Sequence, residues 1–538
     1  MLKRLPLLLV IVVTVALPFI FRTKPAAAGP ADETVVIITP HNEALRYEFG
    51  RGFSAWYQAK AGKTVKVDWR VIGGTSEISR YLEGEYDTAF LRHWTNALGK
   101  PWDNDILAGY KNHKLPADAS AEVKTAREAF LQSEVSCGLD LFFGGGALDF
   151  IKQAQAGRLV NSGIIQRRPD WFGEGVIPRE YSGEPYWDVR GLWVGTALSN
   201  FGIIANSDSL ARLGVSHGVH RWDDLADTRL IGELALADPT KSGSVAKAYE
   251  NIIQQQMQKR WHALQAAHPE ADAEQNEAQA IREGWLSGLR LLQLFGANAR
   301  YFTDSAQKVS IDVAQGDSAA GISIDFLGRQ QEEAIRRRAD RQRLAFVTPV
   351  GGTVNSVDPI ALFRGAPHRD VAVAFIEYVL SMDGQKLWAF RAGTPGGPER
   401  FALRRLPVRR DFYQQADFKA WCSDPDENPY NAEGQLVYRA AWTGGLFREM
   451  SFIIRVMALD THDELVQAWR AIIAAGRPDD ALAVLQDLSA VDYAAASGRI
   501  RQALGAKDKM EQLRLAGELG ELFRAQYRKA EALARAKP

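Results

Sequence analysis

The alternation of short apolar runs with amphipathic stretches is the feature that most restricts the fold of this chain. Val35–Ile38 is the first apolar run, and a stretch with Leu45, Phe49 and Phe53 at helical spacing follows it. Residues 65–71 then alternate apolar and polar side chains, as a strand does, and a second helical stretch comes after them. Strands that alternate with helices favour βα units and a mostly parallel sheet.

Three predicted strands in succession end in small or hydroxyl-bearing residues at the start of a helix. These ends are the segments Thr39–Asn42, Gly73–Ser76 and Gly144–Gly146, and Asp238–Ser244 repeats the pattern later in the chain. Ligands of open α/β sheets bind beyond the carboxyl ends of the strands, where helix N-termini offer free N–H groups and a partial positive charge. The turns therefore predict a site that suits phosphate, phosphonate or carboxylate groups.

The candidate ligand-binding residues lie in these turns and at one further strand end. Glycines let a ligand approach the backbone, hydroxyl groups add hydrogen bonds, and Lys241 adds positive charge. Each residue is alternatively a simple turn or cap residue, and His41 is alternatively an exposed loop residue. Asp325 either recognises an amine or a metal or serves as a cap or ion-pair partner. The full set is Thr39, His41, Asn42, Gly74, Thr75, Ser76, Gly144, Gly145, Asp238, Thr240, Lys241, Ser242, Gly243, Ser244 and Asp325.

The N-terminus indicates export. A positively charged start precedes an apolar run from Leu5 to Phe21, and small residues follow at positions 26–29. This pattern predicts a signal peptide over residues 1–28, cleaved after Ala28. The run is also close to the length that spans a bilayer, so residues 5–21 as an uncleaved membrane anchor are the alternative. We expect a periplasmic protein, either free or attached to the inner membrane.

Charge and motif content exclude several function classes. The 538 residues carry 65 lysines and arginines against 65 aspartates and glutamates, without the basic excess that predicts a nucleic-acid partner. Cys137 and Cys422 are the only cysteines, either one disulfide or two buried thiols, and no zinc-type cluster occurs in the sequence. One GxSxG match, Gly214–Gly218, follows a short helical stretch instead of the strand that a nucleophile elbow requires. We expect a binding protein with no catalytic residues, no bound metal and no cofactor.

Between residues 34 and about 410 the order of motifs resembles a known family. The segments TPHN, GGTSE, DLFFGGGALDF, FGIIANSD, ADPTKSGS and GISIDF occur in that order, followed by the block from Asn355 to Trp388. They resemble the extracellular solute-binding proteins of ABC importers, in the ferric-iron-type branch. Relatives in that branch take up phosphorylated sugars, phosphonates, thiamine or polyamine-like solutes. The resemblance implies an α/β periplasmic-binding-protein fold: two mixed sheets flanked by helices, joined by hinge strands, with the solute enclosed between two lobes and a membrane permease as partner.

Two departures from the family pattern shape the prediction. Ferric-iron binders of the branch use adjacent tyrosines, because Fe³⁺ prefers anionic oxygen ligands, and this sequence contains no Tyr-Tyr pair. Residues 411–538 also add a largely helical C-terminal extension. We therefore expect one lobe from residues 34–195 and 350–410, a second from 205–345, and capture of a small anionic solute. A metal-binding protein and a membrane-anchored ligand sensor are the alternatives.

Overall fold

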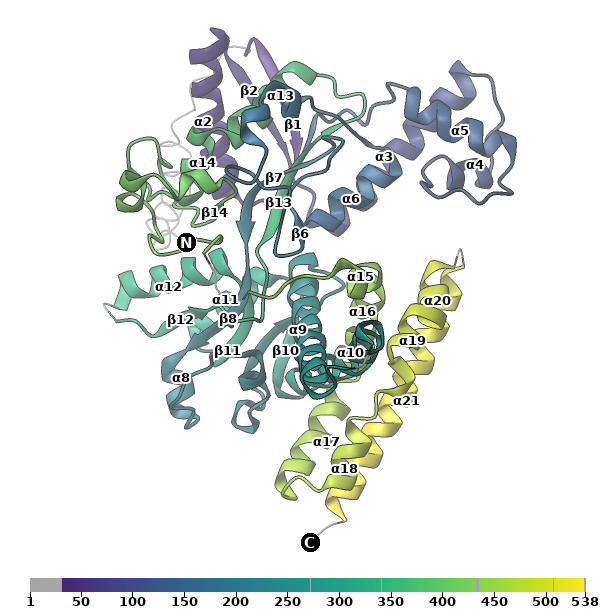
Figure 1. The fold of residues 1–538 in the computed structure, drawn as a ribbon, viewed down its shortest axis with the longest axis vertical. Coiled ribbons are helices and arrows are strands. Elements are labelled where there is room, and N and C mark those ends of the chain that lie inside the picture. Colours follow the sequence, from purple (N-terminus) through teal and green to yellow (C-terminus); the bar gives the residue numbers. More distant parts are fainter. Residues whose placement is uncertain (1–30, 271, 340, 432–434, 507, 537–538) are drawn as a thin grey trace, which may run out of the picture.

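The structure is a computed structural model, and it contains two mixed β-sheets that lie one above the other (Figure 1). We call each sheet, with the helices that cover it, a lobe. The predicted signal peptide or anchor over residues 1–28 lies outside the described residues. The structure describes residues 31–536 except 271, 340, 432–434 and 507.

The first sheet has seven strands and forms the core of the upper lobe in Figure 1. Its strands are β1 (Glu33–Ile38), β2 (Val65–Arg70), β3 (Leu141–Phe143), β4 (Leu159–Val160), β7 (Val194–Ser199), β13 (Ser356–Phe363) and β14 (Leu406–Pro407). β1 lies in parallel between β2 and β3, and β13 runs antiparallel between β3 and β7. The strands predicted at residues 35–38 and 65–71 are confirmed.

Helices cover both faces of the first sheet, and their ends follow local sequence signals. The Asn42 side chain accepts the N–H of Leu45 at the start of the first helix, which ends at Gly62 in a left-handed conformation with φ +69°. The helices of this lobe are α2 (Glu43–Ala61), α3 (Thr75–Arg92), α4 (Asn104–Gly109), α5 (Ala121–Gln132), α6 (Ala147–Ala156), α7 (Ile164–Arg167), α13 (Arg369–Leu380) and α14 (Met382–Ala389).

The second sheet has five strands in the order β10-β9-β11-β8-β12. These are β8 (Phe201–Asn206), β9 (Leu234–Ala237), β10 (Ala299–Thr303), β11 (Ala320–Ile324) and β12 (Leu344–Val347). β9 is parallel to both of its neighbours, whereas β8 is antiparallel to β11 and β12. The helices of this lobe are α8 (Ser207–Arg212), α9 (Gly243–Ala267), α10 (Ala273–Asn298), α11 (Ala306–Gln315) and α12 (Asp325–Ala339).

The chain passes between the lobes at two adjacent places. It leaves the first sheet through Asn200, between β7 and β8, and returns through residues 348–355, between β12 and β13. The two crossings are hydrogen-bonded to each other, because Asn200 Nδ2 donates to Asn355 Oδ1 at 3.3 Å and Phe201 N donates to Thr353 Oγ1 at 3.1 Å. The predicted fold class, two lobes joined by hinge strands, is confirmed.

A helical C-terminal region packs on the second lobe, to the lower right in Figure 1. Its buried side chains, among them Trp442, Met450 and Phe523, belong to the same apolar core as the second sheet. Every helix of the described residues is too short or too polar to cross a membrane. The helices of the region are α15 (Ala440–Thr443), α16 (Phe447–Ile454), α17 (His462–Ala474), α18 (Asp479–Leu485), α19 (Tyr493–Ala495), α20 (Arg501–Gly505) and α21 (Lys509–Arg535).

The segment that leads into this region crosses between the lobes a third time. On the first lobe it meets a hairpin of β5 (Glu180–Tyr181) and β6 (Glu184–Pro185), where Tyr438 N donates to Ser182 O at 2.8 Å. On the second lobe, Arg439 N donates to Oε1 of Gln254 on α9 at 2.9 Å. We call residues 435–443 the strap.

Candidate functional site

A cavity of about 630 Å³ lies between the two lobes. The N-terminal turns of four helices line it: α3 and α6 from the first lobe, and α9 and α11 from the second. The helices meet at close range, since a methyl group added to Gly243 on α9 would lie 3.5 Å from Oγ1 of Thr75 on α3. The volume is that of a site for a small molecule.

The structure brings eight of the fifteen candidate residues to this cavity. They come from turns that are distant in the sequence and meet because parallel strands end at the same edge of a sheet. The eight are His41, Gly74, Thr75, Gly145, Lys241, Ser242, Gly243 and Ser244. Whether they contact a ligand stays a prediction.

The other seven candidates do not line the cavity, and most of them support its walls. Thr39 Oγ1 accepts the N–H of His41, and Asn42 caps α2. Asp238 Oδ1 accepts both the N–H and the hydroxyl of Thr240, which closes the turn before α9. Ser76 lies half-buried in the first turn of α3.

Packing explains why the last two candidates, Gly144 and Asp325, do not line the cavity. A methyl group on Gly144 would lie 2.4 Å from Cε1 of His41, so this glycine makes room for the imidazole instead of a ligand. Asp325 is fully buried at the first turn of α12, and neither of its carboxylate oxygens has a hydrogen-bond partner among the described residues. Burial raises the pKa of Asp325 to about 6, against the opposing effect of Arg329.

One wall of the cavity is a buried charged cluster of His41, Asp358 and Arg405. Asp358 Oδ2 lies 3.0 Å from His41 Nε2 and forms an ion pair with Arg405, while its Oδ1 accepts the N–H of Gly145 at 2.9 Å. Burial alone would raise the pKa of Asp358, but Arg405 and His41 outweigh it and lower that pKa. Arg405 also lies over the ring of Phe326, 4.5 Å from its centre, so the cluster reaches the second lobe.

The first-lobe helices α3 and α6 are capped by their own carboxylates. Glu77 Oε2 accepts the N–H of Gly74 at 3.1 Å, and Asp149 Oδ2 accepts that of Gly146 at 3.3 Å. Burial raises the pKa of Asp149, and Lys152 opposes that change. By contrast, α9 and α11 have no acidic residue in their first turns. The N-termini of α9 and α11 therefore keep more of their own partial positive charge than those of α3 and α6, although Asp304 lines the cavity just before α11.

Two lysines on opposite lobes add positive charge to the cavity. Lys152 on α6 and Lys241 before α9 both line it, and both are exposed. Within the described part of the chain neither forms an ion pair, although Lys152 is near enough to Asp149 to act on its pKa. An anion between the lobes would compensate both lysines.

A second buried ionic cluster joins the first lobe, the second lobe and the strap. Lys247 Nζ on α9 lies 2.6 Å from Oε1 of Glu184 on β6 and 2.9 Å from Oε2 of Glu250. The hydroxyls of Tyr438 and Thr443 donate to the other oxygen of Glu250 at 3.0 and 2.6 Å. Burial alone would lower the pKa of Lys247, but the two glutamates outweigh it and raise that pKa. Glu184 and Lys247 both line the cavity.

Several charged residues of the cavity were not predicted from the sequence. Asp358 carried a signal, because an aspartate inside an otherwise apolar strand has to be paired. Arg405 had none, since it lies in an arginine-rich stretch that has no recognisable periodicity. Glu184 and Lys247 are 63 positions apart, and only the fold brings them together.

The described residues contain neither a disulfide nor a group of side chains placed to bind a metal ion. Cys137 and Cys422 are buried and form no disulfide, and burial raises the pKa of each thiol to about 11. No group of three or more histidine, cysteine, aspartate or glutamate side chains in the described ranges is placed to hold a metal ion.

Comparison with known proteins identifies the family. The profile of the bacterial extracellular solute-binding proteins matches residues 135–407, half of the chain. The protein belongs to this family. Among curated proteins, an uncharacterized protein of Haemophilus influenzae is 26% identical over 251 residues, which cover 46% of this chain and 60% of that relative, less than two thirds of its length.

Solved structures of periplasmic binding proteins resemble this solute-binding protein more distantly. The periplasmic binding protein P5PA is 16% identical with a TM-score of 0.48, over 78% of this chain and 95% of its own. AfuA from Actinobacillus pleuropneumoniae, with fructose-6-phosphate bound, is 17% identical with a TM-score of 0.43, over 72% and 96%. Apo ferric ion-binding protein A of Pasteurella haemolytica is 11% identical with a TM-score of 0.46, over 78% and 96%. Likenesses at this level do not indicate which solute this chain binds.

Proposed function

We propose that this solute-binding protein captures a small anionic solute, phosphorylated or carboxylated, in the cavity between its lobes and delivers it to the permease of an ABC importer. The observation that carries the proposal is the meeting of four helix N-termini from both lobes in one cavity. Backbone N–H groups at helix N-termini bind anions through hydrogen bonds and the helix dipole. In this proposal the protein acts outside the cytoplasm and has no catalytic activity.

The anionic group belongs at the N-termini of α9 and α11. Their first turns contain no acidic residue, and Ser242, Gly243 and Ser244 present backbone and hydroxyl groups to the cavity there. On the first lobe, the carboxylates of Glu77 and Asp149 already occupy the corresponding positions. An anion at α9 would lie between Lys241 and the first-lobe wall, which includes Lys152.

Neutralising the two lysines tests the proposal. Each of Lys152→Met and Lys241→Met removes one charge next to the proposed anion, and we expect each to weaken binding of a phosphorylated or carboxylated solute about tenfold or more. The measurement is calorimetric titration of the mature protein with the best solute from a thermal-shift screen of sugar phosphates, phosphonates and carboxylates.

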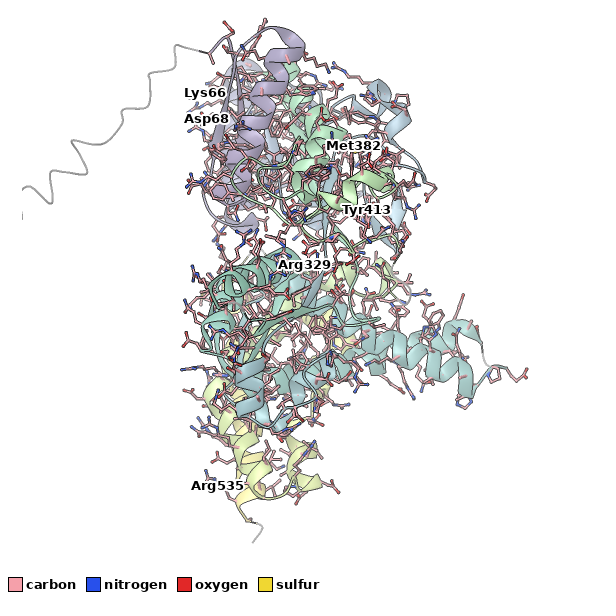
Figure 2. All side chains as sticks on the ribbon, turned by 90° about the vertical axis from the view of Figure 1, so that its left-hand side faces the viewer. Lys66, Asp68, Arg329, Met382, Tyr413 and Arg535 are labelled. Atoms are coloured by element: carbon pink, nitrogen blue, oxygen red, sulfur yellow. The ribbon has the colours of Figure 1, made fainter. Side chains whose placement is uncertain are left out.

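A matched control is available on the outside of the first lobe. Lys66 on β2 is exposed, does not line the cavity, and lies at the far end of that lobe in Figure 2. Lys66→Met makes the same chemical change, and we expect it to leave affinity unaltered. Equal affinity in all three variants, or a screen in which every anion fails and a metal ion succeeds, would contradict anion capture.

A further inference from the structure

The cluster around Glu184 carries an uncompensated negative charge beside the cavity. Glu184 and Glu250 share one cation, Lys247, so the three side chains have a formal charge of −1. Glu250 is fully satisfied, since Lys247 binds one of its oxygens and two hydroxyls donate to the other. Among the described residues, Lys247 is the one group that forms an ion pair with the Glu184 carboxylate, and the oxygen nearest to it, Oε1, accepts no hydrogen bond.

Glu184 faces the cavity while its residue is almost completely buried. It lines the cavity together with Lys247 and is 3% exposed. Burial raises the pKa of Glu184, and the neighbouring carboxylate of Glu250 adds to that effect while Lys247 opposes it. A buried carboxylate in excess of its cations needs a further positive charge or strong hydrogen-bond donors. The cavity side is where a ligand can supply them.

We propose that Glu184 selects solutes that carry a protonated amine in addition to the anionic group. This inference rests on the anion capture proposed above and names the second recognition element of the same cavity. A hydroxyl group would satisfy the hydrogen-bonding capacity of the carboxylate, but a protonated amine also neutralises the excess charge. Glu184 is therefore a specificity-determining residue, and Lys247 and Glu250 position it.

The positions of the two groups along α9 give the approximate scale of the ligand. The proposed anion position is at Gly243, and Lys247, which holds Glu184, is four residues further along the same helix. At a rise of about 1.5 Å per residue, this separation is about 6 Å along the helix axis. A solute with the amine a few bonds from its phosphate, phosphonate or carboxylate group spans it.

Two pairs of probes, matched except for the amine, test the inference. They are 2-aminoethylphosphonate against ethylphosphonate, and glucosamine 6-phosphate against glucose 6-phosphate, titrated calorimetrically into the wild type. We expect the amino member of at least one pair to bind about tenfold tighter or more, as a charge-assisted hydrogen bond provides. In Glu184→Gln, which keeps the shape of the side chain, we expect this preference to fall below about threefold.

Control variants separate the possible outcomes. Glu180→Gln removes an exposed carboxylate from the same hairpin, outside the cavity, and is expected to keep the preference. Glu184→Asp keeps the charge, and a partial preference there supports the proposal even if the glutamine variant does not fold by circular dichroism. Wild-type protein that binds the members of both pairs equally, or a Glu184→Gln protein that retains the preference, overturns the amine proposal alone. Failure of all four probes together with every other anion of the thermal-shift screen overturns anion capture as well.

Discussion

Asp358 connects three parts of the site: the imidazole of His41, the guanidinium of Arg405 and the glycine turn at Gly145. Asp358→Asn keeps the shape of the side chain but leaves Arg405 buried without its ion-pair partner. We expect the free energy of unfolding to fall by about 3–5 kcal/mol, the usual cost of breaking a buried pair. Urea denaturation measures this change. Asp68→Asn, which breaks a surface pair with Arg70, is the control, and its expected effect is below about 1 kcal/mol.

The burial of Asp325 makes the free energy of unfolding depend on pH. Its pKa is about 6 in the folded protein, raised by burial from an ordinary value of 3.8, so the folded state binds its proton more tightly than the unfolded state does. Stability from this group is therefore greatest below pH about 4 and declines as the pH rises toward 6. We expect Asp325→Asn to raise the free energy of unfolding at pH 8 by about 1–3 kcal/mol and to flatten its decline between pH 4 and 6. A variant less stable than the wild type at pH 8 would contradict this account.

At the residue scale, the sequence predicts which turn residues lie at the cavity, but it does not predict which charged residues pair there. Gly74, Thr75, Gly145 and the Ser242–Ser244 turn were placed at the cavity from their positions after predicted strands, because strand polarity fixes which edge of a sheet they occupy. Asp325 also follows a predicted strand, but its side chain is buried in the protein. Periodicity assigns a residue to an element, and it does not show which charges an interlobe cavity brings together.

Among the elements, the β5–β6 hairpin has a tight contact with the strap. Gly183 has φ +78°, and a methyl group added to it would lie 1.9 Å from the carbonyl oxygen of Tyr438. Gly163 has the same φ of +78° with open space around it. We expect Gly163→Ala to cost only the left-handed backbone strain, about 1–2 kcal/mol, and Gly183→Ala to cost clearly more because the strap must also move. Thermal denaturation of both variants measures the difference, and equal losses would show that the strap yields without cost.

The element scale also shows where prediction from the sequence stops. The βα units were recognisable because their strands and helices are local patterns with glycine or hydroxyl punctuation. β13 is less regular: its pairing with β7 shifts register between Asp358 and Pro359, where a proline lacks the N–H of an ordinary strand residue. β14 and the β5–β6 hairpin have two residues per strand, too few for any periodicity. Their pairing depends on contacts between distant segments.

At the scale of the whole molecule, additional contacts connect the lobes beside the hinge. On one side the strap joins the β5–β6 hairpin to α9. On the other, α12 forms ion pairs with the segments before and after β14: Glu333 with Arg404 and Arg329 with Glu427, each at 3.0 Å. Figure 2 shows Arg329 at the level where the lobes meet. The strap also leads to Phe447, which lines the cavity, so the C-terminal region contributes to the site as well as to the second lobe.

The shared core predicts that the second lobe and the C-terminal region unfold as one cooperative unit. Phe523 on α21 is completely buried in the apolar core that includes the second sheet, whereas its neighbour Leu522 is 38% exposed. Phe523→Ala leaves a cavity that costs about 3–5 kcal/mol, and the loss should reach every element that packs on that core. In hydrogen exchange followed by mass spectrometry, we expect faster exchange in β8, β9 and β11 as well as in α21.

The first sheet has a separate apolar core, so β1 and β3 should keep their protection in the same variant. Leu522→Ala, one position away on the outward face of α21, removes a similar apolar side chain without opening the core and should leave the exchange of both sheets unchanged. If Phe523→Ala accelerates exchange in α17, α18 and α21 while β8 and β11 stay protected, the C-terminal region is an independently folding unit attached to the lobe. If both sheets lose protection together, the strap and the interlobe ion pairs couple the two lobes into a single cooperative structure, which would limit how far the cavity opens to admit a solute.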